Sequence, residues 1–154
     1  MSRRDSREAA VKIIFQNTFT DSRLFKSKEE FLTYNSEERN SEAMISTYTD
    51  SLTEEEIDLL DTVYMKDVID GVVEKVTAID EYIVKYSKDW TIERMSKVDL
   101  PILRVAIYEI LYKEDIPSGV SINEAVELAK KYSHNDAGSF INGILGSVYN
   151  ESNA

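Results

Sequence analysis

The stretch MKDVIDGVVEKVTAIDEYIVKY, residues 65–86, carries the strongest structural pattern in this 154-residue chain. Its apolar side chains recur every three or four residues, which is the period of one face of an α-helix. They are Met65, Val68, Ile69, Val72, Val76, Ile79, Ile83 and Tyr86. The stretch therefore predicts a long amphipathic helix that packs one face against other helices, and Gly71 is the point at which it would break.

Further helices are predicted before this stretch. Thr53 with Glu56 three residues on forms a capping box, which predicts the start of the long helix. Residues 6–19 predict a helix that is apolar over a wide arc. Between these two, residues 21–52 are rich in Ser, Glu, Asn and Thr. They predict one short helix and an acidic, partly mobile loop.

Three more helices are predicted in the C-terminal third. Asp99 is the expected N-cap of the first, with Pro101 in its first turn. Ser121 and Glu124 form a second capping box. The last helix starts near Asp136, and it contains three glycines that we expect to permit close approach of another backbone: Gly138, Gly143 and Gly146.

Composition limits the class of protein. With 5 Gly and 2 Pro, the chain has too few turn-forming residues for a many-stranded β-protein, so an all-α fold is expected. The absence of cysteine excludes disulfides and cysteine-based metal sites. No apolar run reaches the roughly 18 residues of a membrane helix, and no signal peptide is recognisable. We therefore expect one cytoplasmic domain, residues 1–154, with an acidic, partly mobile segment at about 29–52.

The net charge of −11 is unevenly distributed along the chain. Residues 1–28 carry seven cations and three anions, a net +4. Residues 29–61 carry eleven anions and one cation, Arg39, a net −10. The remaining residues carry a net −5. A protein with this net negative charge would ordinarily not bind nucleic acid, because phosphates are negatively charged too. The N-terminal segment, residues 1–28, has a net positive charge and could still attract phosphates.

Enzymatic chemistry has little support in the sequence. His134 is the only histidine, and it lies in a predicted turn, which favours a solvated residue over a catalytic one. Paired carboxylates such as Glu54 and Glu55 fall at an acidic helix start, where capping explains them. Phosphate-binding glycine loops and the zinc-protease motif are absent from the sequence. We expect no enzymatic activity, no metal site and no cofactor.

Three groups of residues are candidates for binding. Arg3, Arg4 and Arg7 project from the start of the first helix and either bind phosphates or act as a solubilising tail. Phe140 and Asn142 either stack on and read an unpaired base or belong to the core and the surface. The third group consists of three charged residues on one otherwise apolar helix: Asp99, Arg104 and Glu109. These residues either form a face that docks a partner or are the solvated side of the helix.

Four segments together resemble a known family. They are RRDSREAAV (residues 3–11), VDLPILRVAIYE (residues 98–109), IPSGVSINEAVELAK (residues 116–130) and FINGIL (residues 140–145). In order and spacing they are similar to the NusB family of bacterial transcription antitermination factors. The resemblance covers residues 1–20 and about 70–149.

The resemblance implies an all-α fold of two packed three-helix bundles, with about seven helices and no enzymatic activity. Proteins of this family bind the boxA sequence of nascent RNA, chiefly in ribosomal RNA operons, together with the ribosomal protein NusE. The complex joins elongating RNA polymerase and other Nus factors. The family includes both monomers and homodimers, so a homodimer stays open for this chain.

The resemblance also assigns residues. The RNA-binding part contains Arg3, Arg4, Arg7 and Phe140, to which we add Asn142 from its chemistry. The face that meets NusE contains Asp99, with Arg104 on the same helix, and Asp136 lies near both surfaces. Asp5 interrupts the arginines, and residues 29–61 are unusually acidic. We therefore expect weak RNA binding by the isolated chain and dependence on a basic partner; the alternative is a helical protein-interaction module without RNA binding of its own.

Overall fold

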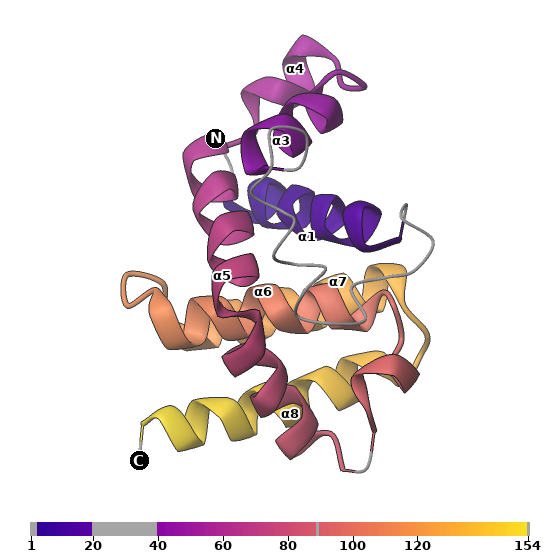
Figure 1. Ribbon diagram of the computed structural model, residues 1–154, viewed down its shortest axis with the longest axis vertical. Coiled ribbons are helices and arrows are strands. Elements are labelled where there is room, and N and C mark those ends of the chain that lie inside the picture. The colour runs from indigo at the N-terminus through magenta and orange to yellow at the C-terminus, as the bar shows by residue number, and fades with distance from the viewer. Residues whose placement is uncertain (1–2, 20–39, 89, 154) are drawn as a thin grey trace. The chain divides into compact units, whose positions relative to one another are not determined.

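Helices form all the regular structure in the part of the chain that the structure describes. The structure is a computed structural model, and it describes residues 3–19, 40–88 and 90–153. Its elements are α1 (Arg3–Phe19), α3 (Ser41–Thr49), α4 (Glu54–Asp58), α5 (Thr62–Tyr86), a 3-10 turn η2 (Ile92–Arg94), α6 (Asp99–Tyr112), α7 (Ser118–Tyr132) and α8 (Ala137–Ser152) (Figure 1). The all-α prediction is confirmed for these ranges, whereas the interpretation of residues 20–39 lies outside them.

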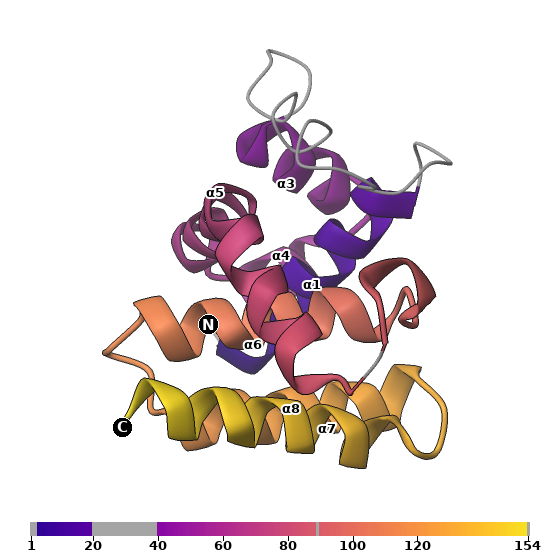
Figure 2. The same ribbon diagram turned by 60° about the horizontal axis from the view of Figure 1, so that its bottom comes forward.

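Two compact units divide the chain, Met1–Glu74 and Lys75–Ala154, and the division falls inside α5. In the first unit, α1 packs against α3, and the N-terminal half of α5 belongs to the same unit. In the second unit, α6, α7 and α8 all pack against one another, and Figure 2 shows α7 and α8 side by side. None of the described helices has both the length and the apolar character needed to cross a membrane.

α5 contributes buried side chains along its whole length, as the period of residues 65–86 predicts. Seven members of the stripe are at most 5% exposed: Met65, Val68, Ile69, Val72, Val76, Ile79 and Ile83. Gly71 is also buried, and the helix runs through it without a break. The expected break is therefore wrong, because a helical glycine costs only about 1 kcal/mol relative to alanine. Each buried Val or Ile beside it contributes about 1.5–3 kcal/mol.

The long helix begins later than the capping box predicts. The box itself is present: Thr53 Oγ1 accepts a hydrogen bond from the Glu56 N–H at 3.1 Å, and Glu56 Oε1 accepts one from the Thr53 N–H at 2.9 Å. However, α4 ends at Asp58 and α5 begins at Thr62. The box therefore starts a separate short helix rather than the long one.

Asp61 marks the start of α5. Its Oδ1 accepts a hydrogen bond from the Tyr64 N–H at 3.1 Å, as an N-cap does. Its own N–H donates to the Oγ of Ser6 at 2.7 Å, and Ser6 is a fully buried residue of α1. Because this bond joins residues 55 positions apart, no local pattern indicates the break between α4 and α5.

The start of α6 is capped by a serine that the sequence analysis did not identify. Ser96 Oγ accepts hydrogen bonds from the N–H groups of Val98 and Asp99 at 3.2 and 3.3 Å. Asp99 is already the first helical residue, and Val98 occupies the N-cap position. The prediction that Asp99 is the N-cap is therefore wrong, whereas Pro101 does lie in the first turn.

α7 begins at Ser118, directly after Pro117, and not at the second capping box. Ser121 lies inside the helix and is fully buried. Its hydroxyl donates to Glu109 Oε1 of α6 at 2.8 Å. The predicted box of Ser121 and Glu124 is wrong because α7 starts three residues earlier, so Ser121 is an interior helical residue and not an N-cap.

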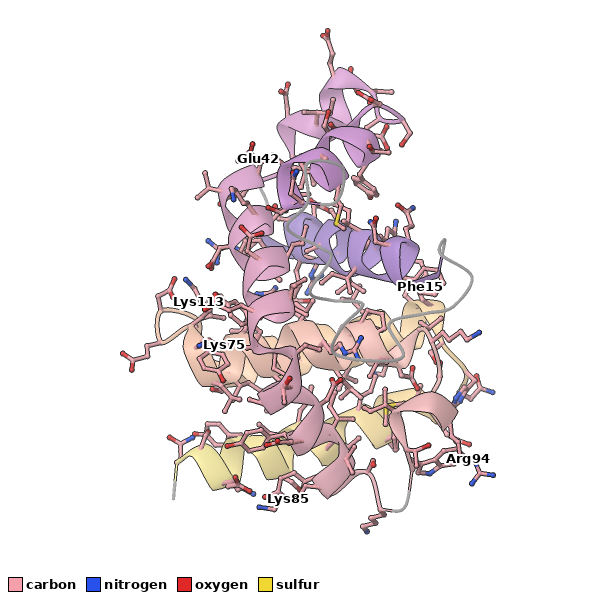
Figure 3. All side chains as sticks on the ribbon, viewed as in Figure 1. Phe15, Glu42, Lys75, Lys85, Arg94 and Lys113 are labelled. Carbon is pink, nitrogen blue, oxygen red and sulfur yellow. The ribbon has the colours of Figure 1, made fainter. Side chains whose placement is uncertain are left out.

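Glu151 joins the C-terminal ends of α5 and α8 within the second unit. It accepts hydrogen bonds from Lys85 Nζ at 2.5 Å and from the Tyr86 hydroxyl. Lys85 is labelled near the C-terminal end of α5 in Figure 3. These two donors lower the pKa of Glu151 below its ordinary value, and the hydrogen bond from Lys85 has the larger effect. The same bond raises the pKa of Lys85.

The glycines of α8 do not make the close backbone contacts that we expected. A Cβ added at Gly138 would meet a side chain, Val126 Cγ1, at the ordinary contact distance of 3.6 Å. A Cβ added at Gly143 or Gly146 would meet nothing within 4 Å. Asp136 precedes the helix as predicted, and the predicted apolar stripe is buried: Ile141, Ile144, Leu145 and Val148. Packing among the described residues therefore does not require glycine at positions 143 and 146.

Replacing Gly143 or Gly146 by alanine is expected to raise the free energy of unfolding by about 0.5–1 kcal/mol, because alanine has the higher helix propensity. Urea denaturation followed by circular dichroism measures the change. A loss of stability in either variant would contradict the conclusion that an added Cβ meets no neighbouring atom at these positions.

Candidate nucleic-acid interface

The three N-terminal arginines differ in their exposure. α1 begins at Arg3, so all three lie in its first two turns. Arg3 and Arg4 are exposed, with 46% of the Arg3 side chain accessible. Arg7 is only 3% exposed. The expectation that the cluster projects from the helix start agrees with Arg3 and Arg4, but Arg7 is held within the structure.

Tyr64 of α5 lies against two of these arginines. The guanidinium carbon Cζ of Arg3 is 4.5 Å from the centroid of the Tyr64 ring, and that of Arg7 is 5.8 Å away. Both distances are within the roughly 6 Å at which an aromatic face attracts a cation. Tyr64 is itself only 5% exposed. A buried aromatic ring of α5 thus holds two cations of α1 in the first unit.

Asp61 places a carboxylate beside the same cluster. Its Oδ2 is 3.9 Å from Arg3 Nη2, while its Oδ1 caps α5. The side chains of this pair are 46% and 25% exposed, so the ion pair contributes at most about 1 kcal/mol. An external anion can therefore compete with Asp61 for Arg3.

Phe140 and Asn142 point to different sides of α8. Successive helical residues turn by about 100°, so residues two apart lie about 200° apart around the axis. Phe140 is half-buried and Asn142 is exposed. Asp136 is exposed and lies one turn before Phe140, whose N–H donates to the Asp136 carbonyl at 3.2 Å. The structure therefore brings Phe140 near Asp136 and leaves Asn142 on the opposite flank.

The charged residues of α6 are all buried. Asp99 and Arg104 are 2% exposed and Glu109 is fully buried, which excludes the interpretation of a solvated helix side. Arg104 forms a two-point ion pair with Asp80 of α5, with Nε–Oδ1 at 3.0 Å and Nη2–Oδ2 at 2.8 Å. The side chain that we considered for partner binding is thus used inside the second unit.

One oxygen of Asp99 has no hydrogen-bond partner within residues 3–19, 40–88 and 90–153. This atom, Oδ1, has less than 1 Å² of accessible surface. An unsatisfied buried polar atom costs about 1–3 kcal/mol. The position of Asp99 in the first turn of α6 stabilises its negative charge through the helix dipole. A donor from outside the described residues would remove the remaining penalty.

His134 lies in the exposed turn between α7 and α8, which agrees with the interpretation of a solvated turn residue. Its carbonyl accepts a hydrogen bond from the Ala137 N–H at 3.0 Å. The described part of the chain contains no group of three or more His, Cys, Asp or Glu side chains that could hold a metal ion.

Tyr64 and Asp80, which contact the candidate site residues, are not predicted from the sequence. Tyr64 directly precedes the first residue of the apolar stripe, and the four-residue spacing of Arg3 and Arg7 indicates that both face one side of α1. This spacing indicates that Arg3 and Arg7 can contact the same side chain of another helix. Asp80 lies 24 positions from Arg104, and no local pattern connects the two.

Replacing Asp80 by alanine is expected to lower the free energy of unfolding by about 1–3 kcal/mol, because the buried Arg104 guanidinium loses its carboxylate. Urea denaturation measures the loss. Glu81, the exposed neighbour on α5, is the matched control, and its alanine variant should stay within about 0.5 kcal/mol of the parent. Equal stabilities of the two variants would contradict a structural role for the ion pair.

Comparisons with known proteins agree with this architecture. The NusB family model matches residues 4–150. The transcription antitermination protein NusB of Ruminiclostridium cellulolyticum is 43% identical over 148 residues, which cover 96% of this chain and 88% of that protein. Among solved structures, NusB of T. maritima has a TM-score of 0.74 and 29% identity, and the match covers 98% of this chain and 92% of that one.

A further solved structure, of antitermination factors NusB and NusE in complex with dsRNA, has a TM-score of 0.70 and 21% identity. The match covers 97% of this chain and 96% of that one, and at this identity it supports the fold alone. The family match, in contrast, spans nearly all of the chain and is supported by close relatives with the same name. This chain therefore belongs to the NusB family, whose relatives are transcription antitermination proteins.

Proposed function

We propose that this protein acts in transcription antitermination by binding boxA RNA together with the ribosomal protein NusE, without catalysing a reaction. The complex joins elongating RNA polymerase and other Nus factors in the cytoplasm, chiefly on ribosomal RNA operons. Membership of the NusB family supports this proposal. The proposed partners are those named for a solved complex of the same fold, NusB with NusE and dsRNA.

The observation that carries the proposal is the pair of exposed arginines, Arg3 and Arg4, at the start of α1. The positive end of the helix dipole disfavours cations at this place, so helix stability does not explain them. A guanidinium binds a phosphate through two parallel hydrogen bonds. In this proposal Arg3 and Arg4 contact phosphates, and the buried Arg7 adds positive charge from within the first unit.

Phe140 is the proposed stacking residue. Phe140 is half-buried on α8, so part of it stays open to a base, and base–aromatic stacking contributes about 1–3 kcal/mol per base. Asn142, on the other flank of α8, offers a second contact to a base edge across the exposed face of the helix. The two residues thus bind different nucleotides.

Asp99 is the proposed point of contact with NusE. Its Oδ1 has no partner in the described part of the chain but is closed to solvent. In this proposal, binding of NusE at the start of α6 opens a path to this oxygen, where a basic group then forms a charge-assisted hydrogen bond. Arg104 acts indirectly, because its ion pair with Asp80 fixes α6 against α5 in the second unit.

The acidity of the chain makes RNA binding dependent on that partner. The net charge is −11, and residues 29–61 contribute −10 of it. We propose that residues 1–154 form one RNA-binding domain. The acidic segment at about 29–52 is part of this domain. The same acidity favours a second candidate function, a helical protein-interaction module without RNA binding of its own.

A gel shift with boxA RNA is expected to show weak binding by the protein alone and tighter binding when NusE is present. Because phosphate contacts release counterions, the logarithm of the affinity should fall linearly with the logarithm of the salt concentration, by about 0.7 per phosphate contact. Equal binding of a scrambled RNA would contradict the proposal. Capture of NusE without any RNA-dependent complex would favour the interaction module instead.

Substitution of Phe140 and of Arg4 is expected to separate the contribution of stacking from that of charge. Phe140→Ala should weaken boxA binding at least about fivefold, the equivalent of the lost stacking energy. Arg4→Glu should weaken binding and reduce the salt slope by about 0.7. The matched controls are Tyr112→Ala, a partly exposed aromatic at the end of α6, and Arg94→Glu, an equal change of charge in η2 (Figure 3). Equal affinities of candidates and controls, with unchanged circular dichroism, would contradict the assignment.

A further inference from the structure

The cation cluster at the start of α1 is organised by one residue of another helix. Tyr64 lies 4.5 Å from the Arg3 guanidinium and 5.8 Å from that of Arg7, measured from the ring centroid. The ring is buried, at 5% exposure, whereas the Arg3 side chain is nearly half exposed. Arg3 therefore contacts a buried ring inside the protein and keeps a side open to solvent.

The backbone of Tyr64 is tied to α1 by two successive hydrogen bonds. Ser6, between Arg3 and Arg7 in the sequence, accepts the hydrogen bond of the Asp61 N–H at 2.7 Å. Asp61 in turn accepts the hydrogen bond of the Tyr64 N–H at 3.1 Å. These two bonds tie the start of α5 to the same two turns of α1 that carry the arginines. The residue that carries the ring and the residues that carry the guanidinium groups are thus held beside one another in the first unit.

This arrangement lowers the entropic cost of binding an anion. A free arginine side chain loses conformational freedom when it is ordered. A guanidinium held over an aromatic face is already ordered, and its N–H donors lie in its own plane, where a phosphate can reach them. Asp61 Oδ2, at 3.9 Å from Arg3 Nη2, is a weak anion at this place that a phosphate can displace.

We propose that Tyr64 is a positioning residue for RNA binding, because its ring holds the Arg3 guanidinium in place to receive an RNA phosphate. The inference rests on the proposed function, in which Arg3 contacts RNA. It adds a residue of α5 that does not touch the RNA itself. It also predicts that the affinity for RNA depends on the aromatic character of residue 64 and not only on its volume.

The test compares boxA binding, with NusE present, for Tyr64→Phe, Tyr64→Leu and a ring-fluorinated phenylalanine at position 64. Tyr64→Phe keeps the aromatic face and is expected to bind within about twofold of the parent. Tyr64→Leu removes the face and is expected to bind about two- to fivefold more weakly, the equivalent of a cation–π contact of about 0.5–1 kcal/mol. Fluorination withdraws electron density from the ring at nearly constant shape, so its affinity should fall towards that of Tyr64→Leu.

A double-mutant cycle with Arg3→Ala distinguishes positioning from a general structural effect. If Tyr64 acts through Arg3, then Tyr64→Leu weakens binding in the parent and has little further effect in the Arg3→Ala background. A general loss of structure would weaken binding equally in both backgrounds. The salt slope gives a second measure, because a lost phosphate contact lowers it by about 0.7 in the parent background only.

Tyr112→Leu is the matched control. Its ring lies 5.3 Å from Lys75 Nζ in the second unit, so the substitution also removes a ring and a cation–π contact. It should leave boxA binding unchanged, and circular dichroism at the assay temperature checks folding of every variant. If Tyr64→Leu does not fold, the fluorinated variant still tests the inference, because it keeps the shape of the ring.

The outcomes separate the inference from the proposed function. If the parent binds boxA RNA specifically and Tyr64→Leu or the fluorinated variant binds equally well or more tightly, the positioning role is wrong and the proposed function stands. If the parent binds boxA and scrambled RNA equally with NusE present, both are overturned.

Discussion

The apolar stripe on α5 is the constraint on which the rest of the structure depends. Its members are buried from Met65 to Ile83, and the helix contributes to both compact units. Because a helix is rigid, the phase of this stripe also fixes the direction of every other side chain on α5. Tyr64 meets the arginines of α1 and Asp80 meets Arg104 of α6 for this reason. The same helix thus shapes the core and the candidate binding residues.

Buried charges set the arrangement of the second unit. Arg104 is paired with Asp80, and Glu109 of α6 accepts the hydroxyl of Ser121 of α7. Such groups are costly to bury without partners, so any other register between these helices would leave them unsatisfied. A helix that is apolar except for three charges is therefore held in one position. Asp99 differs from the other two because one of its oxygens has no partner within the described residues.

The distribution of charge matters more for binding than its total. A net charge of −11 argues against nucleic acid, yet the first 28 residues carry +4 and two of their arginines are exposed at the start of α1. In physiological salt, charges more than about 8 Å apart in solvent are largely screened. A local cluster of guanidinium groups can therefore attract phosphates on an acidic protein. The acidic residues elsewhere reduce the affinity, and a basic partner would compensate for them.

The sequence by itself determined the helical class, the apolar faces of α5 and α8 and the basic N-terminus, because helix period and local charge are properties of neighbouring residues. The resemblance of four segments determined the family. Local capping also sets the start of α6, where Ser96 lies only three residues before Asp99 and was not among the predicted caps. Only the tertiary structure decided where α5 begins and paired Ser121 with another helix, since Ser6 of α1 and Glu109 of α6 supply these partners. It also decided which charges are buried: Arg7 and Arg104 resemble surface cations in the sequence, and each is enclosed because another helix places its side chains against it.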